Sequence, residues 1–213
     1  MKVFQGTSYK GTRILFGNEK RETINKLVNL LRAYGCDEIS FPVIQYAETF
    51  KDKVGAENNN LMYNFTDRGN RDLCLAPEYT AVVQPLTKTR FKFKDNVKLF
   101  YIQECFRGEK PQAGRYRQFT QVGVEIINPT KDFTEELSTL AESLVWECLP
   151  SDQDFNVEVN MGTTRGLDYY KEGKGFEITV AELGSSKQVV GGGEYENGIG
   201  FALGLDRILS LRK

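Results

Sequence analysis

The chain has 213 residues, enough to bury one hydrophobic core, so a single catalytic-size domain spanning residues 1–213 is predicted. Its 28 basic and 29 acidic residues leave a net charge of −1, which argues against a basic coat for nucleic acid but allows a local basic patch. There is no apolar run of membrane-spanning length and no signal-peptide core near the first residues, so a cytoplasmic location is expected.

The amino-acid composition restricts the chemistry. The chain contains no histidine, which excludes imidazole general bases, Ser-His and Cys-His nucleophilic systems and histidine-based metal sites. The four cysteines are dispersed without a CxxC pair, so they are expected to be reduced thiols and not a zinc site or disulfide framework. Any catalysis must therefore use carboxylates, guanidinium groups, a bound metal or the substrate itself.

The first part of the chain predicts helices and short strands. An amphipathic helix is predicted at 18–34, and Gly35 is suited to end it. Short strands are predicted at 38–44 and 61–65. A second helix is expected to begin near Glu78, because Pro77 can precede or occupy a first helical turn.

The rest of the chain alternates strands with few helices. Strands are predicted at 99–106, 119–127, 155–161 and 176–180, with a helix at 132–148. Residues 198–211 are expected to form a glycine-rich approach to a terminal helix. The predicted fold class is α+β, with a mainly antiparallel sheet flanked by helices.

The segment from Phe106 to Glu125, FRGEKPQAGRYRQFTQVGVE, carries the strongest chemical signal. It places several cations in a loop between two strands, and alternation along the second strand puts Gln121 and Glu125 on one face. Such cations are suited to hold phosphate, and the amide and carboxylate are suited to a polar ligand. A solvated hairpin tip with scattered charge explains the spacing equally well.

This segment resembles motif 2 of the class II aminoacyl-tRNA synthetases, in its histidyl-tRNA synthetase form. Every fixed position of the pattern F-R-x-E-x-P-Q-x-G-R-Y-R-Q-F-x-Q-x-G-x-E is present. RGLDYY at 165–170 is similar to a signature of the histidyl family, and GFALGLDR at 200–207 resembles motif 3. Weaker similarities occur at 73–80 and, for motif 1, at 35–55. The resemblance implies a class II catalytic fold and a homodimer formed through the Gly35–Pro42 region.

The resemblance also implies the catalytic arginines and the ATP site. Arg107 would contact the α-phosphate and the amino-acid carboxylate, Arg165 would supply a second cation to the α-phosphate, and Arg207 would hold the γ-phosphate and adenine ring. Arginines in this role stabilise the charge that develops on phosphorus. The other implied ATP-binding residues are Glu109, Arg115 and Phe119. Taken singly, each arginine is more often a surface ion-pair residue.

Further ligand contacts follow from the same resemblance. The implied histidine-binding residues are Glu78, Thr80, Gln121, Glu125, Arg165, Tyr169, Tyr170 and Tyr195. A tyrosine-rich core with structural carboxylates is the alternative. The acceptor end of tRNA would approach Lys110, Gln112 and Arg115. ATP and Mg²⁺ are the implied cofactors, and no protein ligand to a metal is predicted.

The chain departs from the family at several points. Ala76 replaces an arginine and Tyr79 a glycine in the 73–80 motif, and Glu194 stands where the family carries arginine. A tyrosine ring at position 79 is expected to narrow the amino-acid site. The short interval between Glu125 and Arg165 and the end of the chain after Arg207 predict that the family's insertion domain and anticodon-binding domain are absent.

Three functions are consistent with the sequence. The favoured one is ATP-dependent activation of histidine to histidyl-adenylate, with transfer to tRNA. The first alternative is a non-catalytic histidine sensor like the regulatory subunit of ATP phosphoribosyltransferase, although a sensor does not need the complete ATP site that the motifs imply. The second is an enzyme that forms an aminoacyl-adenylate and passes it to an acceptor other than tRNA.

Overall fold

The computed structural model describes residues 9–12, 18–51, 53, 59–110, 114–164, 167–184 and 187–212. The helices in these residues are α1 (Asn18–Ala33), α3 (Thr80–Lys88), α4 (Thr134–Cys148) and α5 (Leu205–Ile208). The strands are β1 (Asp37–Glu38), β2 (Ile44–Tyr46), β3 (Tyr63–Thr66), β4 (Asp72–Leu75), β5 (Val97–Phe106), β6 (Gln118–Ile127), β7 (Val157–Thr163), β8 (Tyr170–Val180), β9 (Gln188–Tyr195) and β10 (Gly198–Gly204).

Two sheets organise this part of the chain. The larger has seven strands in the order β1-β5-β6-β10-β9-β8-β7, and the smaller has the order β2-β4-β3. In the described residues, only the β1–β5 pair is parallel. The predicted α+β class with a mainly antiparallel sheet is confirmed.

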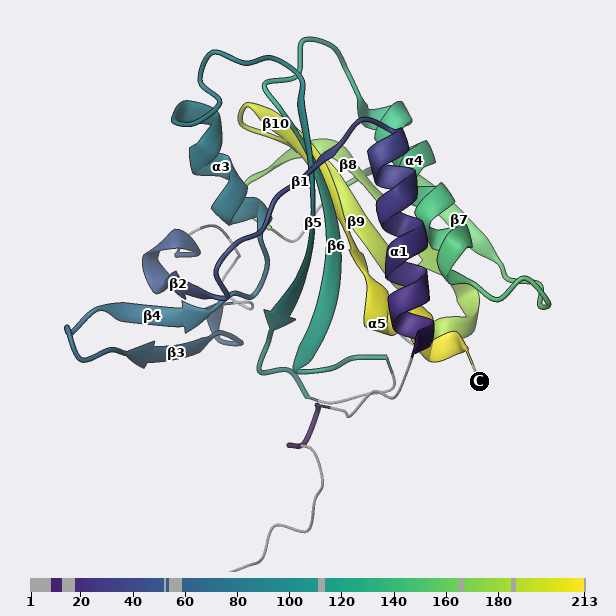
Figure 1. Ribbon diagram of the computed structural model, residues 1–213, viewed down its shortest axis with the longest axis horizontal. Coiled ribbons are helices and arrows are strands. Elements are labelled where there is room, and N and C mark those ends of the chain that lie inside the picture. The colour runs from purple at the N-terminus through teal and green to yellow at the C-terminus, as the bar shows by residue number, and fades with distance from the viewer. Residues whose placement is uncertain are drawn as a thin grey trace, which may run out of the picture.

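The larger sheet is covered differently on its two faces. Helices α1 and α4 lie together on one face, and α3 and the smaller sheet lie on the other (Figure 1). The main core lies between the sheet and helices α1 and α4. It includes Val122, Val124 and Phe201 from the sheet and Leu31 and Leu144 from the helices. A second core on the α3 side contains Phe50, Ala76, Tyr79, Ala81, Tyr101 and Cys105.

Strand β6 separates the core from the candidate site. Val122, Val124 and Ile126 are fully buried in the main core. Because side chains alternate along a strand, Gln121 and Glu125 lie on the opposite face, toward α3. The two-faced arrangement predicted for residues 119–127 is therefore confirmed, and it directs the side chains of Gln121 and Glu125 away from α1 and α4.

The predicted end of the first helix is confirmed in detail. Helix α1 ends at Ala33, and Gly35 has a φ of +89°, the left-handed conformation that suits glycine after a helix. The amide of Cys36 donates to the carbonyl of Leu31 over 3.0 Å, which satisfies one of the helix's terminal carbonyls.

Among the described residues, no helix is long and apolar enough to cross a membrane.

One predicted strand was wrong. The strand expected at 38–44 is reduced to the two residues of β1, because the chain then leaves the sheet edge: the amide of Phe41 donates to the Gln103 side chain over 3.1 Å, and Pro42 has no amide hydrogen. The terminal helix expected within 198–211 is confirmed as the four-residue α5, and the glycine-rich approach to it is strand β10, paired on both sides.

A polar cluster fastens α1, α4 and β5 together. The carboxylate of Glu136 on α4 accepts hydrogen bonds from the Tyr34 hydroxyl at 2.5 Å, Lys131 at 3.0 Å and Lys98 at 3.3 Å. The ammonium of Lys98 also lies 3.8 Å from the centre of the Tyr34 ring. The hydrogen bond from Tyr34, followed by those from the lysines, lowers the pKa of Glu136 to about 2.

We expect Glu136→Gln to lower the free energy of unfolding by about 1 kcal/mol at neutral pH, because the amide keeps the shape but loses the charge-assisted bonds. A carboxyl group whose pKa is lowered by folding stabilises the fold at pH values above its ordinary pKa. This contribution disappears as the pH falls toward the lowered pKa of the folded state. The difference from the unmodified protein should therefore shrink in acid. Denaturant unfolding at neutral and acidic pH tests this.

The matched control is Glu147→Gln on the same helix, where the carboxylate contacts the exposed Lys26 at 3.2 Å. An exposed pair of this kind contributes about 0–1 kcal/mol. Equal losses in the two variants, or a loss in Glu136→Gln that persists in acid, would contradict the assigned role of the cluster.

Candidate functional site

A buried carboxylate lies at the centre of the large sheet. Glu125 on β6 is opposite Gly200 on β10 in the strand register, two residues beyond the Gly123–Ala202 pair. A Cβ atom at Gly200 would overlap the Glu125 carboxylate. Position 200 therefore requires glycine, because the Glu125 side chain crosses over β10.

Two hydroxyl groups hold Glu125 in place. Its Oε1 accepts a hydrogen bond from Thr80 at 2.6 Å, and its Oε2 accepts one from Tyr195 at 2.9 Å. The side chain has no exposed surface. Burial raises the pKa of Glu125 to about 8, since the two hydroxyl donors offset only part of the lost hydration.

A second carboxylate, Glu78, lies at the beginning of α3. Its Oε2 accepts from the Thr80 amide at 2.7 Å and from the Tyr169 hydroxyl at 3.1 Å, and its Oε1 accepts from the Ala81 amide at 3.0 Å. These amides belong to the first turn of α3, where a carboxylate is favoured. Burial nevertheless raises the pKa of Glu78, and the Arg107 charge opposes that shift.

Tyrosine side chains surround the two carboxylates. The ring of Tyr169 lies 4.6 Å from that of Tyr170 and 6.3 Å from that of Tyr195, measured between ring centres. Burial raises the pKa values of Tyr169 and Tyr195 well above the ordinary value, so both hydroxyls stay protonated as hydrogen-bond donors at neutral pH. The pocket thus presents fixed acceptors and donors in a space shielded from water.

Two arginines that are a hundred residues apart in the sequence meet beside this pocket. The Nε of Arg107 donates to the carbonyl of Pro77 over 2.9 Å, and its guanidinium carbon lies 5.3 Å from the centre of the Phe119 ring. The Nη1 of Arg207 donates to the carbonyl of Gln188 over 2.9 Å. Backbone carbonyls therefore orient both cations without neutralising them, so both remain available to an anion.

A third cation lies at the same place. Arg115 forms an ion pair with the carboxylate of Glu109, which is itself largely buried. Burial and the nearby Arg115 charge lower the pKa of Arg207. An anionic ligand here would relieve the repulsion between the two guanidinium groups.

These groups line one open cleft of about 480 Å³. Of the residues predicted from the sequence, the cleft brings together Glu78, Thr80, Arg107, Glu109, Arg115, Phe119, Gln121, Tyr169, Tyr170 and Arg207. A cleft that joins a carboxylate pocket to a group of arginines can hold a ligand with a cationic or N–H-bearing part and a polyanionic part.

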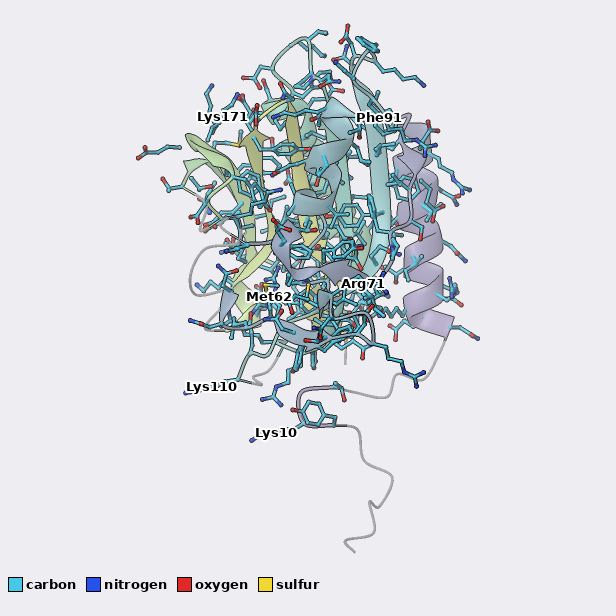
Figure 2. The ribbon with its side chains drawn as sticks, turned by 90° about the vertical axis from the view of Figure 1, so that its left-hand side faces the viewer. Lys10, Met62, Arg71, Phe91, Lys110 and Lys171 are labelled. Atoms are coloured by element: carbon cyan, nitrogen blue, oxygen red, sulfur yellow. The ribbon has the colours of Figure 1, made fainter. Side chains whose placement is uncertain are left out.

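Among the described residues, three predicted ones do not line the cleft: Glu125, Tyr195 and Lys110. Glu125 and Tyr195 are fully buried behind the cleft wall and contact it through Thr80, so they do not line the open space. Lys110 is exposed at the same end of the molecule as Lys10, at the opposite end from Lys171 (Figure 2). Gln112 and Arg165 lie outside the described residues. The individual roles of all these residues remain predictions.

Several cleft residues were not singled out from the sequence. They are Leu61, Tyr116, Leu167, Gln188, Val189, Val190 and Ala202. Tyr116 and Leu167 lie inside the segments that resemble family motifs, and this location was the sequence signal that could have identified them. Gln188 acts through its backbone carbonyl, and the residues around it have no chemical pattern of their own. Two glycines of the sheet, Gly191 and Gly204, also line the cleft.

The expectation that Tyr79 narrows the amino-acid site is wrong. Its ring is fully buried in the second core, 5.6 Å from Phe41 and 5.4 Å from Tyr101 between ring centres. Its hydroxyl donates to the carbonyl of Glu104 over 3.1 Å. The chain turns between Glu78 and Thr80, so the tyrosine between them faces away from the cleft, and Ala76 is buried in the same core.

Comparison with known families and sequences gives consistent matches. The sequence model of the histidyl-tRNA synthetase family matches residues 17–149. A histidine–tRNA ligase of Methanosarcina acetivorans is 35% identical over 176 residues, covering 76% of this chain and 43% of the ligase. One from Methanococcus vannielii is 36% identical over 165 residues, covering 74% of this chain and 38% of the ligase. The chain thus spans less than half the length of these relatives.

Solved structures agree on the fold. Apo histidyl-tRNA synthetase of Staphylococcus aureus is 26% identical and matches with a TM-score of 0.73, covering 98% of this chain and 69% of the other. A Bacillus halodurans protein titled ATP phosphoribosyltransferase regulatory subunit/histidyl-tRNA synthetase matches with a TM-score of 0.77 over 100% of this chain and 85% of that one. At 16% identity, the second match shows the fold alone.

The raised pKa of Glu125 predicts how stability depends on pH. Folded Glu125 keeps its proton up to about pH 8, whereas the unfolded residue loses it near pH 4.5. Between these values the folded state binds more protons, so this residue makes the free energy of unfolding decrease as the pH rises. We expect Glu125→Gln to remove much of that decrease, on the order of 1 kcal/mol for each unit of pKa difference.

Denaturant unfolding of both proteins at about pH 5 and about pH 8 measures the effect. Glu78 is retained in both and contributes in the same direction, so only the difference between the proteins reports Glu125. An identical loss of stability with rising pH in the two proteins would contradict the raised pKa.

Proposed function

Because the chain belongs to the histidyl-tRNA synthetase family, we propose that it is a cytoplasmic enzyme that activates histidine with ATP. The products would be histidyl-adenylate and pyrophosphate, followed by transfer of the histidyl group to the 3′ end of tRNA. The observation that carries this proposal is the cleft itself, where Arg107 and Arg207 lie beside the pocket that contains Glu78. That arrangement suits a triphosphate and an amino acid bound side by side.

Two carboxylates suit the two ends of histidine. Glu78 lines the cleft and would pair with the substrate ammonium group, while Glu125, behind the wall, would accept an imidazole N–H. A buried polar group without its partner is costly, so amino acids lacking the matching donor would be rejected. Gln121 lines the same wall and adds an amide to the recognition.

The arginines suit the nucleotide. Arg107 would contact the α-phosphate, and Arg207 would hold the γ-phosphate and the adenine ring. Phe119 lies in the cleft wall and offers an aromatic face for stacking with a base. Glu109 would accept from the adenine amino group, and its ion pair with Arg115 holds it in place.

The reaction needs no nucleophile from the protein. An oxygen of the histidine carboxylate attacks the α-phosphorus, the new carboxyl–phosphate bond forms, and the bond to the β-phosphate oxygen breaks to release pyrophosphate. The chain's contribution is to orient both substrates and to stabilise the charge on phosphorus with guanidinium groups. The absence of histidine from the sequence is compatible with this chemistry.

Magnesium fits the same cleft as a partner of the triphosphate. The described residues contain no cluster of three or more acidic or cysteine side chains that could hold a metal on their own. Mg²⁺ usually needs only one or two protein carboxylates beside phosphate oxygens, so a bound triphosphate would supply most of its ligands. Bound there, the ion would neutralise phosphate charge.

Lys110, Gln112 and Arg115 of the 106–125 segment would approach the acceptor end of tRNA. Lys110 is exposed, which suits contact with a phosphate backbone, and such contacts position a nucleic acid without specifying its sequence.

A homodimer formed through the Gly35–Pro42 region also belongs to the proposal.

A pyrophosphate-exchange assay with each standard amino acid tests the proposal. We expect ATP–pyrophosphate exchange with histidine and no comparable exchange with the others, because only histidine has the imidazole N–H that Glu125 would accept. Exchange with histidine without charging of its tRNA would favour an acceptor other than tRNA. Saturable histidine binding without exchange for any amino acid would contradict the proposal and favour the histidine sensor.

A variant of Arg165 tests the implied second cation on the α-phosphate. We expect Arg165→Ala to reduce exchange by about a hundredfold or more, because removing one charge-stabilising donor has effects of this size in other enzymes. The fold should persist, as judged by circular dichroism and thermal unfolding. The control is Arg32→Ala, which removes an exposed arginine that pairs with Glu38. Near-normal exchange in Arg165→Ala would refute the assigned role.

A further inference from the structure

A buried ionic network lies at the end of the candidate cleft, between α1, α5 and the large sheet. Asp206 immediately precedes Arg207 and is 3% exposed. One carboxylate oxygen of Asp206 accepts a short hydrogen bond from the backbone amide of Thr120. The other lies 3.2 Å from the ammonium of Lys20, in the first turn of α1. A buried carboxylate is stable only when it is paired in this way.

Lys20 also binds β6 directly. Its ammonium donates to the Thr120 hydroxyl over 2.5 Å, and that hydroxyl donates to Glu104 on β5 over 2.7 Å. Glu104 and Thr120 are opposite each other in the β5–β6 ladder. The Lys20 side chain is only 23% exposed, so water screens these interactions little. One lysine thus links α1, α5 and the strands β5 and β6.

The strand register explains why a side chain is needed at this point. The β6–β10 ladder ends at the pair formed by Gln121 and Gly204, after which the chain turns into α5. The Asp206 carboxylate continues the ladder by one hydrogen bond, since it accepts from the next amide of β6. It therefore fixes where α5 begins relative to β6.

Two members of the network, Thr120 and Asp206, are adjacent in sequence to residues of the cleft. Thr120 stands between Phe119 and Gln121, and Asp206 stands beside Arg207. Phe119, Gln121 and Arg207 all line the cleft. The guanidinium of Arg207 donates to the carbonyl of Gln188, another residue of the cleft. A shift of α5 relative to β6 would therefore change the distance between the guanidinium and the aromatic ring.

We propose that Asp206, held by Lys20, is a positioning residue that sets the separation of Arg207 from Phe119 and thereby the geometry of the nucleotide site. The inference rests on the proposed function, because it takes the ligand between these side chains to be ATP. Neither Lys20 nor Asp206 lines the cleft, so both act through their neighbours. A purely structural ion pair would stabilise the fold without a selective effect on the nucleotide.

The test compares Lys20→Met with Lys20→Arg and with the control Lys26→Met, in the full chain. Lys26 is on the same helix, and its side chain is 61% exposed. Within the described part of the chain it forms an ion pair only with Glu147. We expect Lys20→Met to raise the KM for ATP by about tenfold or more in pyrophosphate exchange, because small displacements of binding groups have effects of this size. The KM for histidine should change much less, Lys20→Arg should restore most of the ATP affinity, and Lys26→Met should match the unmodified protein.

Calorimetry with a non-hydrolysable ATP analogue separates this inference from the proposed function. If the unmodified protein binds the analogue but catalyses no exchange, the enzymatic proposal fails, and weaker binding by Lys20→Met still supports positioning. Unchanged ATP affinity in a folded Lys20→Met, or equal rises in the KM values for ATP and histidine, would overturn the inference. Failure of the unmodified protein to bind the analogue would overturn both.

Discussion

The burial of two carboxylates within one pocket is the constraint on which the site depends. Glu125 and Glu78 are both removed from water, and each needs donors from other elements to remain there. The donors come from the first turn of α3, from Tyr169 and from Tyr195, so helix, sheet and pocket must form together. Their raised pKa values show that these partners do not fully replace hydration. A ligand that brings further hydrogen-bond donors would complete the pocket, as the proposed function requires.

Strand β6 connects this pocket to the rest of the molecule. One face of the strand carries Val122, Val124 and Ile126 into the main core, while the other carries Gln121 and Glu125 toward the ligand side. Because the core face is apolar, a shift of one residue in register would bury the wrong side chains. The packing of α1 and α4 against the sheet therefore also determines where the polar groups stand. The segment that carries Arg107, Glu109 and Arg115 joins β5 to this strand, so the arginines and the buried carboxylate share one support.

Periodicity and motif spacing were sufficient to predict much of this arrangement. The two faces of β6, the stop at Gly35 and the fold class follow from local rules and are confirmed. The shortness of β1 and the pairing of β10 could not be predicted. Both depend on partner strands distant in sequence, which decide where an edge strand ends and whether a glycine-rich segment can form a strand. For Tyr79, the motif gave the position but not the direction of the side chain, which is set by the second core. The network of Lys20, Thr120 and Asp206 joins residues far apart in the chain. Thr120 and Asp206 lie in the segments that resemble motifs 2 and 3, but no sequence pattern links either of them to Lys20.

The central claim is that histidine and ATP occupy adjoining parts of one cleft. The most direct test is a crystal structure of the chain with a non-hydrolysable histidyl-adenylate analogue. The account predicts the imidazole against Glu125, the phosphate-mimicking group at Arg107, and the adenine ring against Phe119. An analogue bound at another surface, or bound in the cleft with its imidazole away from Glu125, would contradict it.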